Sequence, residues 1–128
     1  MVKQERSGQV ISALVVLFMV FDGVIHVMKI APVVDAFAQL GYPLRMAVPL
    51  GILELCITAL YAIPGTAVIG AMLLTAYFGG ATAAQLRIGA DLFPIIFPVL
   101  LGALLWGGLY LRDERIRALM AAKGRVTC

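Results

Sequence analysis

Residues 10–29 read VISALVVLFMVFDGVIHVMK, an apolar run long enough to cross a membrane as a helix. In a helix, Asp22, His26 and Lys29 stand at i, i+4 and i+7 and therefore share one face. A carboxylate about 10 Å inside the end of a lipid-spanning helix costs roughly 2.5–3.5 kcal/mol on insertion scales. Asp22 is therefore expected to face protein or a wet cavity rather than lipid.

The whole chain has the composition of an integral membrane protein. Of its 128 residues, 62% are hydrophobic and 13% are charged, whereas soluble domains carry about 45–50% apolar and about 25% charged residues. The length fits one domain covering residues 1–128, without room for a soluble partner domain. Basic and aromatic residues do not interleave on a soluble surface, which argues against a nucleic-acid partner. The expected surroundings are the lipid bilayer.

Four apolar segments predict an all-α fold, an integral membrane four-helix bundle. The expected spans are residues 8–28, 46–63, 66–86 and 93–111, followed by an amphipathic tail over 112–128. The third span carries Gly70, Gly79 and Gly80, and such small residues predict close packing against its neighbours. Between the first two spans, residues 32–40 are too short to cross and put their apolar residues on one face. This segment is predicted to be a short amphipathic helix on the outer surface, between Pro32 and Gly41.

The basic residues predict the orientation. Seven of them lie in the two tails, against three in the two opposite loops. Loops rich in lysine and arginine stay on the cytoplasmic side, so both termini are expected to face the cytoplasm.

Three polar side chains from three spans are predicted to share one depth. Asp22, Glu54 and Tyr77 lie about 10, 12 and 13 Å inside the outer helix ends, at 1.5 Å per residue. Four further polar residues lie above them, toward the surface: His26, Lys29, Gln85 and Arg87. These seven residues are the candidate ligand-binding site of the outer half.

Asp22 and Glu54 are the candidate acid–base pair, and His26 is the third catalytic candidate. Two carboxyls at one depth in a low dielectric rarely both ionise, so at least one is expected to be protonated at neutral pH. The same residues also fit a purely structural role, in which Asp22 pairs with His26 or Lys29 and Glu54 accepts a hydrogen bond from Tyr77.

No metal site is predicted, because one histidine and two acids at different heights match a zinc or iron site poorly. The chain also carries no cofactor-binding motif, so redox chemistry would require a bound cofactor or a partner subunit.

Four segments of the chain resemble the DoxX-like small membrane proteins of bacteria. They are FDGVIHVMKIAPVVDAFAQLGYP (21–43), GILEL (51–55), GAMLLTAYFGGATAAQLRIG (70–89) and LLWGGLYLRDERIRAL (104–119). The resemblance implies a four-helix protein of the bacterial cytoplasmic (inner) membrane. It also implies the motif positions Asp22, Gly23, Glu54, Gly79, Gly80 and Arg87.

The resemblance also bears on chemistry. The wider group is named for membrane subunits linked to quinone-dependent sulfur oxidation and to a terminal quinol oxidase. This chain has Gln85 where the resemblance leads us to expect histidine, and glutamine does not exchange a proton near neutral pH. That departure weighs against proton-coupled redox chemistry in this chain.

Three functions remain open from the sequence. The first is binding of a lipid-soluble small molecule such as a quinone, as an accessory subunit of a membrane oxidoreductase or as a homo-oligomer. The second is a stand-alone intramembrane enzyme, such as an isoprenoid isomerase or cyclase, in which the acids protonate the substrate and stabilise a cation. The third is a small proton-coupled transporter or a scaffold.

Overall fold

A computed structural model describes residues 2–121, all of whose regular structure is helical. Four helices are long and apolar enough to cross a membrane: α1 (Val2–Met28), α3 (Ala47–Ala62) with the 3₁₀ turn before it, α4 (Ala67–Arg87) and α5 (Leu92–Arg112). The predicted all-α membrane bundle is confirmed. The predicted tail positions Lys123, Arg125 and Cys128 lie outside the described residues.

The helix boundaries differ from the predicted ones mainly at the start of the chain. α1 begins at Val2 rather than at residue 8, because a hydropathy boundary ignores the polar residues 3–6, which are nevertheless helix formers. The 3₁₀ turn η1 (Leu44–Met46) leads into α3. The short α2 (Ala31–Leu40) has a proline in its first turn and ends at Gly41, whose φ of 75° suits glycine. The tail forms α6 (Glu114–Ala121).

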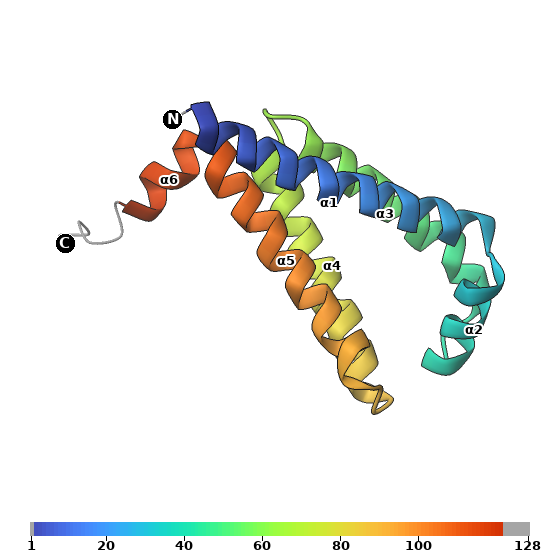
Figure 1. Cartoon of the computed structure of the whole chain (residues 1–128). Coiled ribbons are helices and arrows are strands. Elements are labelled where there is room, and N and C mark those ends of the chain that lie inside the picture. The colour runs from blue at the N-terminus through green and yellow to red at the C-terminus, as the bar shows by residue number, and fades with distance from the viewer. Residues whose placement is uncertain (1, 122–128) are drawn as a thin grey trace, which may run out of the picture.

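The four long helices form two pairs that diverge. α1 packs on α3 and α5, and α4 packs on α3 and α5. Figure 1 shows the α1–α3 pair and the α4–α5 pair close together near the N-terminus and separating toward the end that carries α2. The bundle thus has a closed end, where α1 begins and α6 lies, and an open end beside α2.

The closed end is held by close backbone approaches and one buried tyrosine. A Cβ on Gly8 would lie 2.8 Å from the Gly108 carbonyl, so α1 and α5 nearly touch there. The Tyr61 hydroxyl donates to the Leu105 carbonyl over 2.7 Å and lies 3.0 Å from Ser12 Oγ. Tyr61 therefore joins α1, α3 and α5 at a point where all its polar atoms are buried.

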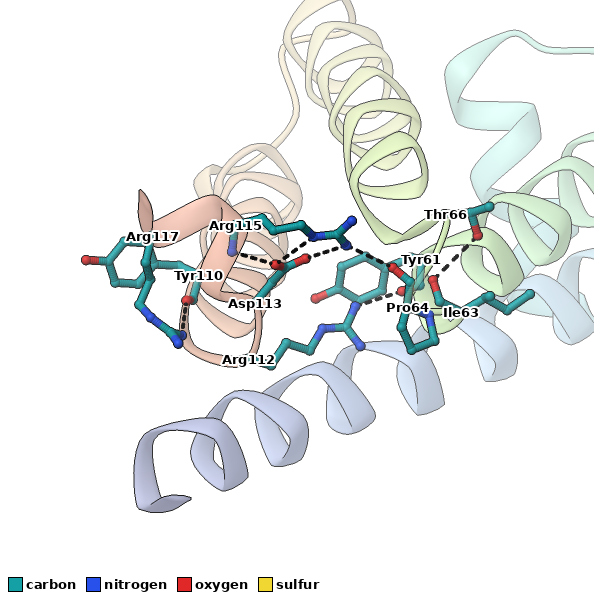
Figure 2. Close-up of polar contacts among 9 residues, drawn as sticks. All are labelled: Tyr61, Ile63, Pro64, Thr66, Tyr110, Arg112, Asp113, Arg115 and Arg117. Atoms are coloured by element: carbon teal, nitrogen blue, oxygen red, sulfur yellow. Dashed lines mark hydrogen bonds and ion pairs between the residues drawn. The ribbon is translucent and has the colours of Figure 1, made fainter. Parts of the chain in front are cut away.

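Arg112, the last residue of α5, and Arg115, near the start of α6, make the polar contacts at this closed end (Figure 2). Arg112 donates to the Tyr61 carbonyl over 2.7 Å, and its guanidinium lies 4.7 Å from the centre of the Tyr61 ring. Asp113 caps α6 by accepting the Arg115 amide over 2.9 Å. A hydrogen bond from the Arg115 side chain holds the pKa of Asp113 below its usual range.

The prediction of close packing along the third span is right for Gly70 and wrong for the other two glycines. A Cβ on Gly70 would fall 2.6 Å from the Tyr61 Cα, so α3 and α4 touch there. Nothing lies within 4 Å of a Cβ on Gly79 or Gly80. The helix pairs diverge toward the open end, and neither Gly79 nor Gly80 of α4 has another helix packed against it there.

Candidate functional site

A cavity of about 680 Å³ opens between the two diverging helix pairs. Its wall is mostly apolar and aromatic, with contributions from all four long helices, from α2 and from the 3₁₀ turn η1. Five polar side chains reach its lining, namely Asp22, His26, Tyr42, Tyr77 and Gln85. A mostly apolar pocket of this size with a few converging polar groups is typical of small-molecule sites.

Three of these polar side chains meet Glu54 at the inner wall. The Tyr77 hydroxyl donates to Glu54 Oε2 over 3.2 Å. His26 Nδ1 lies 3.5 Å from Asp22 Oδ2 and 3.9 Å from Glu54 Oε2, and it donates to the Asp22 carbonyl over 2.7 Å. Asp22, His26, Glu54 and Tyr77 are called the polar cluster below.

The cluster forms because two glycines let α1 and α3 approach closely beside it. A Cβ on Gly51 would lie 2.8 Å from the Gly23 carbonyl and 2.9 Å from the His26 Cβ. Gly23 follows Asp22 in the chain, and Gly51 lies one helical turn before Glu54. The two glycines thus set the separation of the two carboxyl groups.

His26 lies beside the acids and not above them, where the count of residues had put it. Side chains in an α-helix point back toward its N-terminus. The His26 ring therefore covers the turn that carries Asp22, although His26 lies one helical turn closer to the end of α1 at the open end of the bundle. The different heights on which the sequence argument against a metal depended are not observed, since one ligand atom each from Asp22, His26 and Glu54 lies within 4.8 Å of the others.

Glu54 is the most enclosed member of the cluster. Its side chain is 0% exposed, against 17% for His26 and 30% for Asp22. Its Oε1 is buried and, within residues 2–121, has no hydrogen-bond partner. No lysine or arginine of the described part of the chain forms an ion pair with Asp22 or Glu54. Burying a charged or unpaired polar group in this way is unfavourable unless something compensates it.

The remaining predicted site residues lie at different places. Gln85 lines the cavity. Lys29 ends α1 with a φ of 52°, is exposed, and does not line the cavity. Arg87 is also exposed and donates to the Leu40 carbonyl at the C-terminal end of α2. The geometry gives Arg87 a contact that holds α2, and its contact with a bound molecule stays a prediction.

α2 covers part of the cavity as a lid. Ala36, Phe37 and Leu40 contribute to the lining. The buried Phe37 ring meets the His26 ring edge-on, with 5.8 Å between ring centres. The segment is helical and amphipathic as predicted. Its buried residues Val33 and Phe37 share an apolar cluster with Ala47 of α3, and Ile25 of α1 packs against that cluster.

Replacing Arg87 with alanine is expected to loosen this lid. The change removes the hydrogen bond from the charged Arg87 side chain on α4 to α2. Hydrogen bonds of charged groups contribute roughly 1.5–3 kcal/mol to stability, and less where water competes for the same groups. Hydrogen–deuterium exchange of residues 33–40 should rise several-fold in Arg87→Ala, with exchange in α5 unchanged. Arg45→Ala, at an exposed arginine of the 3₁₀ turn η1, is the matched control. Equal exchange in both variants would contradict the proposed lid contact.

The sequence argument missed the aromatic wall of the cavity. Phe18 packs edge-on against Phe97, with ring centres 5.3 Å apart, and Phe93 lies 5.3 Å from Phe97. Phe93 and Phe97 stand four residues apart on α5, a spacing that places both on one face. That spacing was the available signal, but in a membrane span it does not distinguish a face toward lipid from a face toward a cavity.

The fold and the cavity define a class, a multi-pass membrane protein with a polar cluster beside an apolar pocket. The model of the DoxX-like family matches residues 10–108, and the chain belongs to that family. The match includes every member of the polar cluster and every long helix in whole or in part. No curated protein and no solved structure gave a significant match.

Proposed function

We propose that the protein binds a lipid-soluble small molecule with a polar head group, with a quinone as the leading candidate. The observation that carries this proposal is the cavity of about 680 Å³, apolar around its wall and polar where Asp22, His26, Tyr77 and Gln85 reach it. Its volume lies within the roughly 300–1,000 Å³ of ligand pockets. The partner that follows is a molecule dissolved in the bilayer.

The chemistry of the wall fits a quinone in two ways. Phe18, Phe93 and Phe97 offer aromatic faces and edges to a flat ring. The Gln85 side-chain NH₂ can donate a hydrogen bond to one carbonyl oxygen of a quinone. An oxidoreductase role would place this chain as an accessory subunit, with the redox cofactor on a separate membrane partner.

The path into the cavity is expected to run from the lipid past α5. Leu92 and Phe93 are each 71% exposed at its first turn, and Phe93 also lines the cavity. A molecule that partitions into the bilayer therefore meets apolar side chains before it reaches the polar cluster.

The test uses two neighbouring glycines of α4. Gly80 lines the cavity and Gly79 does not, while a Cβ at either position has open space. Gly80→Leu is expected to fill the cavity and lower the content of co-purified lipid-soluble molecule at least about tenfold, or about 1.4 kcal/mol. Gly79→Leu should leave it unchanged. The readout is solvent extraction of protein purified in mild detergent, followed by mass spectrometry. Equal content in both variants would refute the proposal.

A second function, an intramembrane acid–base enzyme, is favoured by one observation. The carboxyl groups of Asp22 and Glu54 lie together with the His26 imidazole, an arrangement that can donate and accept a proton at one point of a substrate. An isoprenoid isomerase or cyclase needs such a group beside an apolar chain. Product formation from an added isoprenoid by the purified protein alone would support the enzyme over the binding protein.

We propose further that both termini face the cytoplasm of a bacterial cell and that the cavity lies in the outer half of the inner membrane. The support is the seven basic residues near the termini, against three at the opposite end. In intact spheroplasts carrying Cys56→Ser, a membrane-impermeant maleimide is expected to label Ala90→Cys and to spare Cys128. Ala90 is preferred to Gly89, whose φ of 65° disfavours cysteine. Labelling of Cys128 would reverse the orientation.

A further inference from the structure

We propose that Asp22, His26 and Glu54 form a binding site for one divalent transition-metal ion. One ligand atom from each residue lies within 4.8 Å of the others, with two carboxylates and one imidazole as donors. Imidazole suits zinc, iron and copper, and carboxylate suits manganese and magnesium. The mixed set fits Zn²⁺, Fe²⁺ or Mn²⁺. This site does not depend on the lipid-soluble ligand proposed above.

The distances are those that a metal ion can bridge. Bonds of about 2.0–2.2 Å place two tetrahedral ligand atoms about 3.4 Å apart and two opposite octahedral ligands about 4.2 Å apart. His26 Nδ1 lies 3.5 Å from Asp22 Oδ2 and 3.9 Å from Glu54 Oε2. Only small side-chain movements are therefore needed to bring the donors onto one ion.

A bound cation would neutralise the two carboxylates of the polar cluster. Glu54 is 0% exposed, and its buried Oε1 has no hydrogen-bond partner within residues 2–121. The second carboxylate, Asp22, lies beside it, and in the described part of the chain neither acid pairs with lysine or arginine. Two ionised carboxylates and one divalent ion sum to zero charge. A site with no net charge costs less to bury in a low dielectric than one with uncompensated charges.

The geometry also leaves room for an external ligand on the ion. Three protein ligands are the pattern of metal sites that keep an open position, whereas structural sites are closed by four. Asp22 and His26 line the cavity, so the open positions face it. Binding through Nδ1 requires loss of the proton that this nitrogen donates to the Asp22 carbonyl, as metal binding to histidine generally does.

The test is a Co²⁺ titration of the full chain in detergent, purified with a tag free of histidine. We expect one Co²⁺ per chain, displaced by Zn²⁺, with visible ligand-field bands. Glu54→Gln and His26→Ala should each weaken Co²⁺ binding at least about tenfold. Asp35→Asn, which changes an exposed acid on α2, should bind Co²⁺ as the unaltered protein does. Circular dichroism checks each fold, and Asp22→Asn replaces any variant that does not fold.

Two results would overturn the metal site. Binding that survives in all the cluster variants would place the ion elsewhere. Failure of the unaltered protein to bind Co²⁺ would mean that protons, not a cation, neutralise the carboxyl pair. X-ray absorption at the cobalt edge adds an independent criterion, since the ligands should be nitrogen and oxygen with one imidazole. Extraction of lipid-soluble molecules from metal-free protein tests the proposed function separately.

Discussion

Replacing Gly70 with valine is expected to cost roughly 3 kcal/mol or more and to lower the melting temperature of the bundle sharply, because it overpacks a helix contact. A Cβ at Gly70 would fall 2.6 Å from the Tyr61 Cα and 2.8 Å from the Leu60 carbonyl carbon. Both atoms belong to the backbone of α3, which cannot rotate out of the way as a side chain can. α3 and α4 would have to separate beside the buried Tyr61.

Gly79→Val is the matched control for this prediction. It places the same β-branched residue in the same helix, so the small change in helix propensity from glycine to valine is shared by both variants. Nothing lies within 4 Å of a Cβ at Gly79, so only the change in helix propensity, below about 1 kcal/mol and in favour of valine, remains. Thermal unfolding followed by circular dichroism in one detergent compares the two. Equal melting temperatures would contradict the close approach of α3 and α4.

The sequence was sufficient to predict the elements of this fold, because hydropathy and the prolines and glycines at helix ends report local structure. Four long apolar runs predicted four spans, and Pro32 with Gly41 bounded the lid helix α2. The shared depth of Asp22 and Glu54 followed from the rise of a helix. Each of these inferences depends on a single segment and not on how segments pack.

What the sequence did not predict depends on the relation between helices. Gly79 and Gly80 look like Gly70 in the sequence, yet only Gly70 meets a neighbouring backbone, because the α4–α5 pair diverges from α1–α3 further out. Arg87 was counted as a ligand-binding residue, but its guanidinium reaches the end of α2. The His26 ring leans back along α1, a displacement that a count of Cα positions omits.

The amide variants Asp22→Asn and Glu54→Gln distinguish a ligand site from a structural pair. An amide keeps the size of the carboxyl group and can still accept the Tyr77 hydroxyl, which now donates to Glu54 over 3.2 Å. It cannot carry charge or exchange a proton near neutral pH. If the acids bind a ligand, both variants are expected to fold normally and to lose at least about tenfold in bound lipid-soluble molecule, or about 1.4 kcal/mol.

The leucine variants Asp22→Leu and Glu54→Leu complete the comparison. If the acids only fix the packing of α1 on α3, replacing a buried polar group by an apolar one of similar volume is neutral or stabilises by about 1–4 kcal/mol. If the acids bind a ligand, the stability of the leucine variants is likewise expected to be unchanged or higher. The bound ligand, however, should then be lost from all four variants. Melting temperature and extracted-lipid content are therefore measured together for all four proteins. Unchanged ligand content in both amide variants would remove Asp22 and Glu54 from the site, because their charge and their protons would then play no part in binding.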